Sequence, residues 1–251
     1  MPSQGKLYVV GIGPGFLDYM TIKAKEVILG SEYIIGNDLY LEQIKALLDG
    51  KKVISGGMGT EVEKAKKAVK LAESHVVSVI SGGDANVYGM AGIVLEVAQK
   101  KGLNVEIEVV PGVTAATAVG SRLGAPIMGD FVVISLSDLL TPWEVIEKRL
   151  KSVASTDFVT IIYNPKSRKR NTNFQKAIKI IREHRSKNVP VGIVKNCMRD
   201  GENVIITTLG EVLEYDNIVN MRTTIIIGNS ESIIWNNKII TRRGYNRKYT
   251  Y

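Results

Sequence analysis

The chain has few of the residues that build disulfide frameworks and metal centres. Its 251 residues include one cysteine, Cys197, and two histidines, His75 and His184. One cysteine cannot form an internal disulfide, and this set is too small for a cysteine-based zinc cluster. We therefore expect no metal site held by the protein.

Long apolar runs and aromatic residues are also scarce. No segment reaches the roughly 18 uncharged apolar residues of a membrane span, and the first residues lead directly into a strand-like segment at 7–10. These features predict a cytoplasmic protein without a membrane partner. Aromatic residues make up 6% of the chain and lie scattered, which argues against a base-stacking surface and a nucleic-acid partner.

The positive charge is the compositional feature that points towards a partner. The formal net charge is +8, which favours an anionic ligand. The clusters at 64–67 and 242–248 are typical of a solvated helix face and a chain end. The cluster at 166–170 instead follows a predicted strand end, where Lys166, Arg168 and Arg170 are candidates to bind carboxylates or phosphates. This cluster also supports the alternative of a basic RNA-binding protein.

Apolar patterning predicts an α/β fold in the first half of the chain. The periodicity predicts strands at 7–10, 31–35, 52–54, 76–80 and 105–110, with helices at 21–29, 42–48, 60–74, 88–100 and 114–123. Thr60 and Glu63 have the spacing of a capping box. Repeated alternation of strand and helix predicts parallel strands with helices on both faces of the sheet.

The pattern changes in the second half, which predicts a mixed sheet. Strands are expected at 131–135, 157–163, 190–195, 203–208 and 223–228, with a helix at 173–185. Thr141 and Glu144 form a second capping box, with Pro142 expected at the first helical position. We predict two domains, residues 1–126 and 127–251, with a ligand site between them.

Small-residue turns follow several of the predicted strands, at 11–15, 81–84, 111–115 and 163–165. Turns of this kind gather at the carboxyl edge of an α/β sheet, where ligands bind. The first turn matches a dinucleotide fingerprint only in part, because Phe16 replaces the third glycine and Pro14 lacks an N–H group. Taken singly, Gly82, Gly83 and Gly112 are explained as positive-φ turn residues, and Asp84 as a helix cap.

Taken together, these motifs resemble a known family. Residues 11–15 with Met20 and Thr21, then 81–84, then 111–116, resemble the N-terminal motifs of the tetrapyrrole methylase superfamily, which uses S-adenosylmethionine. The segments at 88–91, 123–126, 134–143, 163–165, 227–230 and 241–245 resemble its precorrin-3B C17-methyltransferase subgroup. The resemblance implies the two-domain class III methyltransferase fold, with a mostly parallel N-terminal sheet, a mixed C-terminal sheet and an interdomain active site. It also implies a homodimer.

The resemblance further implies an activity in cobalamin biosynthesis, methylation of C17 of precorrin-3B or cobalt-factor III with contraction of the ring. Cobalt, if present, would belong to the substrate. Another precorrin carbon, diphthamide and ribosomal RNA are the alternative targets within the superfamily.

The resemblance also implies site residues. Those assigned to the S-adenosylmethionine pocket are Pro14, Gly82, Gly83, Asp84, Val87, Thr114, Ala115, Asn164 and Cys197. Lys166, Arg168 and Arg170 would bind carboxylates of the substrate. The methyl acceptor is an electron-rich carbon of the substrate, so no activated serine or cysteine is needed. A general base for ring contraction is not assigned among the candidates Asp84, Ser135, Asp138 and Tyr163.

Overall fold

A computed structural model describes residues 5–57 and 59–250. The described chain divides into two compact units, the first ending at Ala115 and the second beginning at Ala116. The sequence placed the boundary later, after residue 126. The helix α5 (Ala115–Leu123) accounts for this difference, because its Leu123 side chain lies directly against Gly192 in the core of the second unit.

The first unit alternates strands and helices around one parallel sheet of order β3-β2-β4-β1-β5. Every strand pairing in this sheet is parallel, as the sequence predicted. Short 3-10 turns lie at Leu17–Tyr19 and Lys45–Leu47. The regular elements of this unit are β1 (Lys6–Gly11), α1 (Ile22–Gly30), β2 (Tyr33–Asn37), α2 (Asp38–Gln43), β3 (Lys52–Gly56), α3 (Glu61–Leu71), β4 (Val76–Ser81), α4 (Ala91–Lys101) and β5 (Glu106–Val110).

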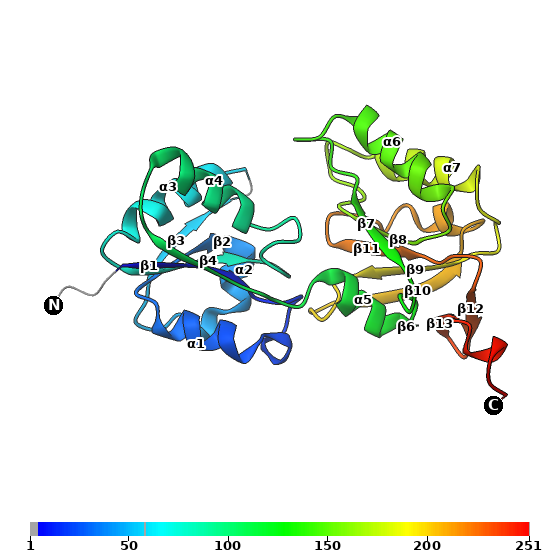
Figure 1. Ribbon diagram of the computed structural model, residues 1–251, viewed down its shortest axis with the longest axis horizontal. Coiled ribbons are helices and arrows are strands. Elements are labelled where there is room, and N and C mark those ends of the chain that lie inside the picture. Colours follow the sequence, from blue (N-terminus) through cyan, green and yellow to red (C-terminus); the bar gives the residue numbers. More distant parts are fainter. Residues whose placement is uncertain (1–4, 58, 251) are drawn as a thin grey trace. The chain divides into compact units, whose positions relative to one another are not determined.

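Helices cover both faces of this sheet, with α3 and α4 on one face and α1 on the other (Figure 1). The side chains of β1 alternate between the two cores. Leu7 and Val9 pack with α3 and α4, whereas Val10 packs with α1. Apolar residues on both faces of a strand are the pattern of a parallel sheet buried between helices.

The second unit has a mixed sheet of order β10-β9-β11-β8-β7 and a small sheet of order β12-β13-β6. The pairing of β7 with β8 is parallel and the other pairings of the larger sheet are antiparallel. This confirms the predicted mixed sheet. Besides α5, the elements of this unit are β6 (Gly124–Ala125), β7 (Phe131–Ser135), α6 (Trp143–Ala154), β8 (Val159–Tyr163), α7 (Asn173–Arg182), β9 (Pro190–Lys195), β10 (Asn203–Thr208), β11 (Thr223–Ile227), β12 (Ser232–Trp235) and β13 (Lys238–Thr241), with 3-10 turns at Val212–Tyr215 and Tyr245–Arg247.

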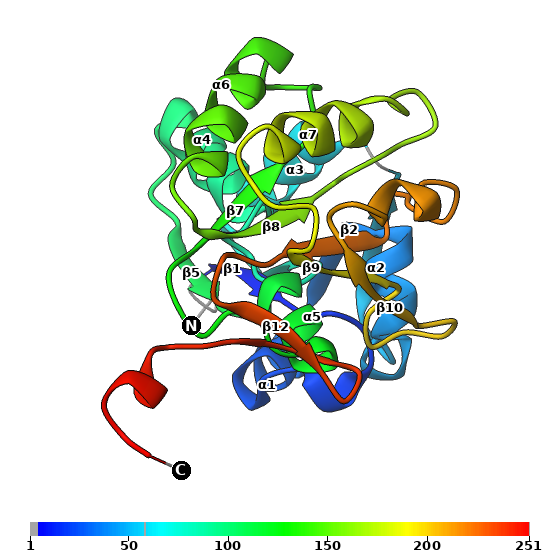
Figure 2. The same cartoon turned by 90° about the vertical axis from the view of Figure 1, so that its right-hand side faces the viewer.

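Helices α6 and α7 lie together on one face of the larger sheet of this unit, and α5 lies on the other (Figure 2). The buried residues of α7 follow the spacing of an amphipathic helix: Phe174, Ala177, Ile178 and Ile181. They form one hydrophobic core with Ile146 and Leu150 of α6 and with the sheet. The packing of this face therefore follows directly from the apolar pattern of the sequence.

Both predicted capping boxes are wrong. Within the described residues, α3 and α6 begin without a side-chain cap. Thr60 donates its hydroxyl to the Gly57 carbonyl at 2.9 Å, and Pro142 takes the N-cap position of α6 instead of the first helical one. A backbone acceptor outside the helix competes with the cap in the first case. In the second, proline occupies the N-cap position and has no polar side chain that could cap the helix.

Some element boundaries also differ from the prediction. The helix expected from Tyr88 begins at Ala91, because residues 82–90 form an irregular loop in which Tyr88 has a φ of 52°. The helix expected at 42–48 is replaced by α2 and a following 3-10 turn. The β12-β13 hairpin was not predicted from the sequence.

Candidate functional site

The loops after β1 and β4 are joined at the carboxyl edge of the first sheet. The Gly13 N–H donates to the Gly83 carbonyl at 3.0 Å, and the Gly83 N–H donates to the Gly13 carbonyl at 2.8 Å. Both residues have positive φ, 78° and 67°, which glycine adopts without steric cost. The predicted convergence of these two motifs is therefore present in the structure.

Asp84 joins the loop after β5 to the same cluster. Its Oδ2 accepts from the Gly112 N–H at 2.9 Å, and its Oδ1 accepts from the Asn86 N–H at 2.8 Å. The alternative role as a helix cap is wrong, because α4 begins only at Ala91. Asp84 therefore connects two strand-end loops, and both of its oxygens accept backbone hydrogen bonds.

The glycines of these loops serve mainly to let backbones approach each other. A Cβ atom on Gly112 would lie 2.3 Å from the Gly83 carbonyl oxygen, and one on Gly82 would lie 2.4 Å from the Tyr40 ring. Neither residue has positive φ, so the explanation as positive-φ turn residues holds for Gly83 and is wrong for Gly82 and Gly112. A larger side chain at Gly112 would force the loops apart, and one at Gly82 would displace the Tyr40 ring.

Four more residues predicted for the cofactor pocket lie on or beside these loops. Pro14 is buried in the loop after β1, and Val87 is half-buried in the loop after β4. Thr114 precedes α5, which begins at Ala115, and a Cβ atom on Gly83 would lie 3.9 Å from the Thr114 Cα. Thr114 therefore lies beside Gly83, and the contacts of Thr114 and Ala115 with the cofactor stay predictions.

The charge of these loops argues against phosphate as the ligand. Residues 12–20, 82–90 and 111–115 contain no lysine or arginine. The first helix begins only at Ile22, after a separate 3-10 turn, so its N-terminus does not open directly from the glycine loop as in a dinucleotide site. A ligand bound here would meet backbone groups and small side chains.

A second group of candidates lies at the carboxyl ends of β7 and β8 in the second unit. Ser135 and Tyr163 are paired residues of the two strands. The Ser135 hydroxyl accepts from Asn164 Nδ2 at 3.0 Å, and the Tyr163 hydroxyl accepts from the Ala116 N–H at 2.6 Å. The structure thus brings Ser135, Tyr163 and Asn164 together, while the candidate Asp84 belongs to the other unit.

Backbone strain also gathers at this edge. Asn164, Asn196 and Met198 have φ values of 50°, 52° and 55°, and they follow the ends of β8 and β9. Conformations of this kind cost about 1–3 kcal/mol and concentrate at functional sites. Asn196 and Met198 were not among the residues predicted from the sequence. Of these two residues, only Asn196 could have been suspected from the sequence, since asparagine adopts left-handed backbone conformations more readily than most residues.

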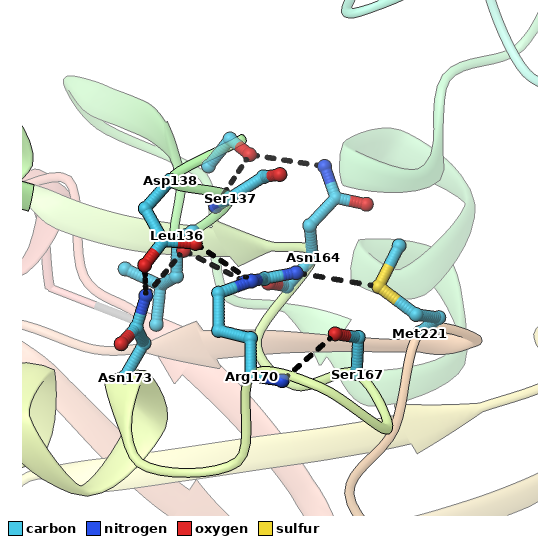
Figure 3. Close-up of polar contacts among 9 residues, drawn as sticks. Leu136, Ser137, Asp138, Asn164, Ser167, Arg170, Asn173 and Met221 are labelled. Carbon is cyan, nitrogen blue, oxygen red and sulfur yellow. Dashed lines mark hydrogen bonds and ion pairs between the residues drawn. The ribbon is translucent and has the colours of Figure 1, made fainter. Parts of the chain in front are cut away.

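Two of the three predicted substrate-binding cations have partners within the protein. Lys166 forms an ion pair with Asp216 and also donates to the Asp216 carbonyl at 3.0 Å. Arg170 donates from Nη1 to the carbonyls of Leu136 and Asn164 at 2.7 and 2.8 Å (Figure 3). Arg168 is exposed, so of the three it best fits the predicted contact with substrate carboxylates.

Cys197 is buried beside Glu202. Burial, together with the Glu202 carboxylate, raises the pKa of its thiol to about 12. The cysteine therefore stays protonated near neutral pH and is no nucleophile there. The contact between Cys197 and the cofactor stays a prediction.

This burial has a measurable consequence. At pH 8 a thiol with a pKa of about 12 is a thiolate in about one molecule in ten thousand. We expect iodoacetamide to leave Cys197 unmodified in the folded protein and to alkylate it rapidly in urea, as measured by mass spectrometry. Alkylation of the folded protein at the rate of a free thiol would contradict the burial of this residue.

The described part of the chain contains neither a cluster of metal ligands nor a membrane-spanning helix. Across residues 5–57 and 59–250, no three residues among the histidines, cysteines, aspartates and glutamates are grouped as metal ligands. In the same ranges no helix is both long enough and apolar enough to cross a membrane.

Comparison with known sequences identifies relatives along almost the whole chain. The model of the family described as Tetrapyrrole (Corrin/Porphyrin) Methylases matches residues 6–213. A probable cobalt-factor III C(17)-methyltransferase of Salmonella typhimurium is 44% identical, over 95% of this chain and 99% of that protein. The cobalamin biosynthesis protein CbiHC of Archaeoglobus fulgidus is 50% identical, over 99% of this chain and 55% of that protein. The chain therefore spans about half the length of the latter relative.

Solved structures agree with the sequence comparison. The methyltransferase CobJ superposes with a TM-score of 0.90 at 29% identity, over 95% of this chain and 100% of that one. A uroporphyrin-III C-methyl transferase from Thermus thermophilus, solved with S-adenyl homocysteine, has a TM-score of 0.68 at 25% identity, over 89% of this chain and 97% of that one. With the matched family model and the full-length relative, these similarities show that the chain belongs to the tetrapyrrole methylase family.

Proposed function

We propose that the protein is an S-adenosylmethionine-dependent methyltransferase that methylates C17 of a tetrapyrrole in cobalamin biosynthesis. The observation that carries this proposal is the match over nearly the full length of both chains to the Salmonella relative, which is named for that reaction. We choose cobalt-factor III as the first substrate to test, because that relative is named for it. Precorrin-3B is the alternative.

The loops of the first unit fit S-adenosylmethionine. Their lack of lysine and arginine suits a ligand without phosphate, and their backbone groups and small side chains can bind an amino-acid head group and an adenosine. Gly82, Gly83, Val87 and Thr114 would contact it, with Asp84 holding the loops together. Asn164 and Cys197 stay predicted contacts from the second unit. When bound, the sulfonium supplies an electrophilic methyl group.

The main task of the protein is to align the methyl acceptor. Holding two reactants in the correct geometry lowers a barrier by roughly 7–11 kcal/mol at most. The hydrogen bonds between the loops after β1, β4 and β5 keep this part of the chain rigid before binding. The base for ring contraction stays unassigned among Asp84, Ser135, Asp138 and Tyr163.

Titration calorimetry with S-adenosylhomocysteine tests the proposed cofactor site. We expect binding to the wild type and about a tenfold higher Kd for Asp84→Ala, because the Gly112 and Asn86 N–H groups lose their acceptor. The matched control is Asp49→Ala, which removes an exposed aspartate of the same unit. Equal affinity in all three proteins would contradict the assigned role of Asp84.

Incubation of the wild type with labelled S-adenosylmethionine and cobalt-factor III tests the reaction. Label at C17, located by NMR, is the expected result. Label at another ring carbon would favour a different reaction of the same family. No transfer to any tetrapyrrole would refute the proposal, and polyanion binding without a response to S-adenosylmethionine would favour the RNA-binding alternative.

Assembly and location stay predictions. We propose a homodimer, as the resemblance to the family implies, and a cytoplasmic protein without a nucleic-acid partner, as the composition predicts. Sedimentation equilibrium measures the assembly directly, and a monomer at micromolar concentration would contradict it.

A further inference from the structure

Two neighbouring leucines project into solvent from the loop between β7 and α6. Leu139 is 82% exposed and Leu140 is 93% exposed. Single exposed leucines are common on protein surfaces and need no explanation. Two adjacent ones at the tip of a short loop present a continuous apolar surface, which is unfavourable in water unless something covers it.

The base of this loop is held firmly by buried polar groups (Figure 3). Asn173 Nδ2 donates to the Leu136 carbonyl at 3.0 Å and to Asp138 Oδ2 at 3.1 Å. Arg170, which is 10% exposed, also donates to the Leu136 carbonyl and forms an ion pair with Asp138 at 3.3 Å. Pro142 ends the loop at the N-cap of α6.

These anchors make the exposure of the leucines a property of the fold. Arg170 and Asn173 hold the residues before the tip, and α6 begins directly after it, so both ends of the tip are anchored. A preformed apolar tip binds with a smaller entropy cost than a flexible one. The exposed leucines are therefore better explained by a role in binding a ligand than by a role in stabilising the fold.

The position of the loop indicates which ligand covers the tip. The loop begins directly after Ser135, at the sheet edge that also carries Asn164 and the exposed Arg168. A tetrapyrrole has an apolar conjugated face and carboxylates around its rim. An apolar tip and an exposed arginine that follow the same sheet edge are complementary to the two parts of such a molecule.

We propose that Leu139 and Leu140 position the substrate by packing against the face of its tetrapyrrole ring. This inference rests on the proposed function, since it assumes a tetrapyrrole substrate. The leucines are positioning residues, and they take no part in the transfer of the methyl group.

The test compares three proteins with the wild type. The double variant Leu139→Asn/Leu140→Asn keeps the size of the side chains and removes their apolar character. Leu139→Met/Leu140→Met keeps the apolar character, and Leu29→Asn changes a leucine of α1 that is 49% exposed. The measurements are the Kd for cobalt-factor III by absorbance titration, the Kd for S-adenosylhomocysteine, KM and kcat, Tm and the sedimentation mass.

We expect the asparagine double variant to raise the Kd and KM for cobalt-factor III by about tenfold or more, since burial of each leucine contributes substantially to binding. Its kcat at saturation, its Kd for S-adenosylhomocysteine and its Tm should match the wild type. The methionine and Leu29 variants should bind cobalt-factor III as the wild type does.

Other outcomes would overturn the inference in different ways. Unchanged binding in the asparagine variant, with an active wild type, would refute the role of the leucines and leave the proposed function standing. A changed sedimentation mass would assign the leucines to contact with a second copy of the chain. A wild type that neither binds nor methylates a tetrapyrrole would refute the proposed function, and the inference with it.

Discussion

Gly112→Ala is expected to destabilise the first unit by about 3 kcal/mol and to weaken S-adenosylhomocysteine binding at least tenfold. The added Cβ would lie 2.3 Å from the Gly83 carbonyl oxygen and 2.7 Å from the Gly11 carbonyl oxygen. Both contacts are with backbone, which cannot move without opening the joined loops. Denaturant unfolding measures the first effect, and titration calorimetry the second.

The control for this variant is the same substitution at Gly92. This residue lies in α4, and a Cβ atom there would meet nothing within 4 Å. Gly92→Ala should be neutral or stabilise the protein by up to about 1 kcal/mol, because alanine favours the helix. If both variants were equally stable, the close packing of the loops at Gly112 would be contradicted.

Arg185→Met is expected to lower the free energy of unfolding by about 3–5 kcal/mol. Arg185 is 8% exposed, and its guanidinium group joins the end of α6, the start of β8 and the residue after β11. Burial lowers the pKa of this group, but arginine stays charged at neutral pH. Its acceptors are the carbonyls of Val153, Ala154, Phe158 and Gly228 and the hydroxyl of Thr160.

Methionine would fill much of the volume of Arg185 and satisfy none of these acceptors. Several carbonyls would then be left inside the protein without their donor, which is costly even when the packing is kept. Arg149→Met is the control, because Arg149 is exposed on α6, and its loss should change stability by less than about 0.5 kcal/mol. Denaturant unfolding of the two variants gives the comparison. A loss below 1 kcal/mol for Arg185→Met would show that these hydrogen bonds contribute little.

Much of the fold could be predicted because its signals are local. The strands Phe131–Ser135, Pro190–Lys195 and Asn203–Thr208 have the predicted bounds, since an apolar run between turn residues marks a strand. The β12-β13 hairpin was missed although the sequence carries a signal for it. Two short isoleucine-rich runs are separated by Asn236 and Asn237, whose φ values of 44° and 53° form the tight turn. The capping boxes failed because a two-residue pattern reveals neither a competing acceptor, as for Thr60, nor the residue at which the helix begins, as for α6.

The candidate site could be predicted only in part. The motifs around Gly13, Gly83 and Gly112 located the loops correctly, because strand ends of a parallel sheet meet at one edge. The reason for the glycines was not visible in the sequence, since it depends on backbone atoms from other loops. The exposed leucines of the β7-α6 loop were noticed in the sequence only as part of a motif.

The sequence by itself determined the class of fold, the strand-end motifs and the family. These depend on residue order and local periodicity. Only the tertiary structure decided what individual polar residues do. Arg170 belongs to a basic cluster in the sequence, yet in the fold it donates hydrogen bonds to the carbonyls of Leu136 and Asn164. The sequence pattern suggested that Asp84 caps a helix, yet in the fold its carboxylate accepts a hydrogen bond from the Gly112 N–H. The physical reason is that such partners lie far apart along the chain, so a side chain's role depends on which backbone groups the topology brings within hydrogen-bond distance.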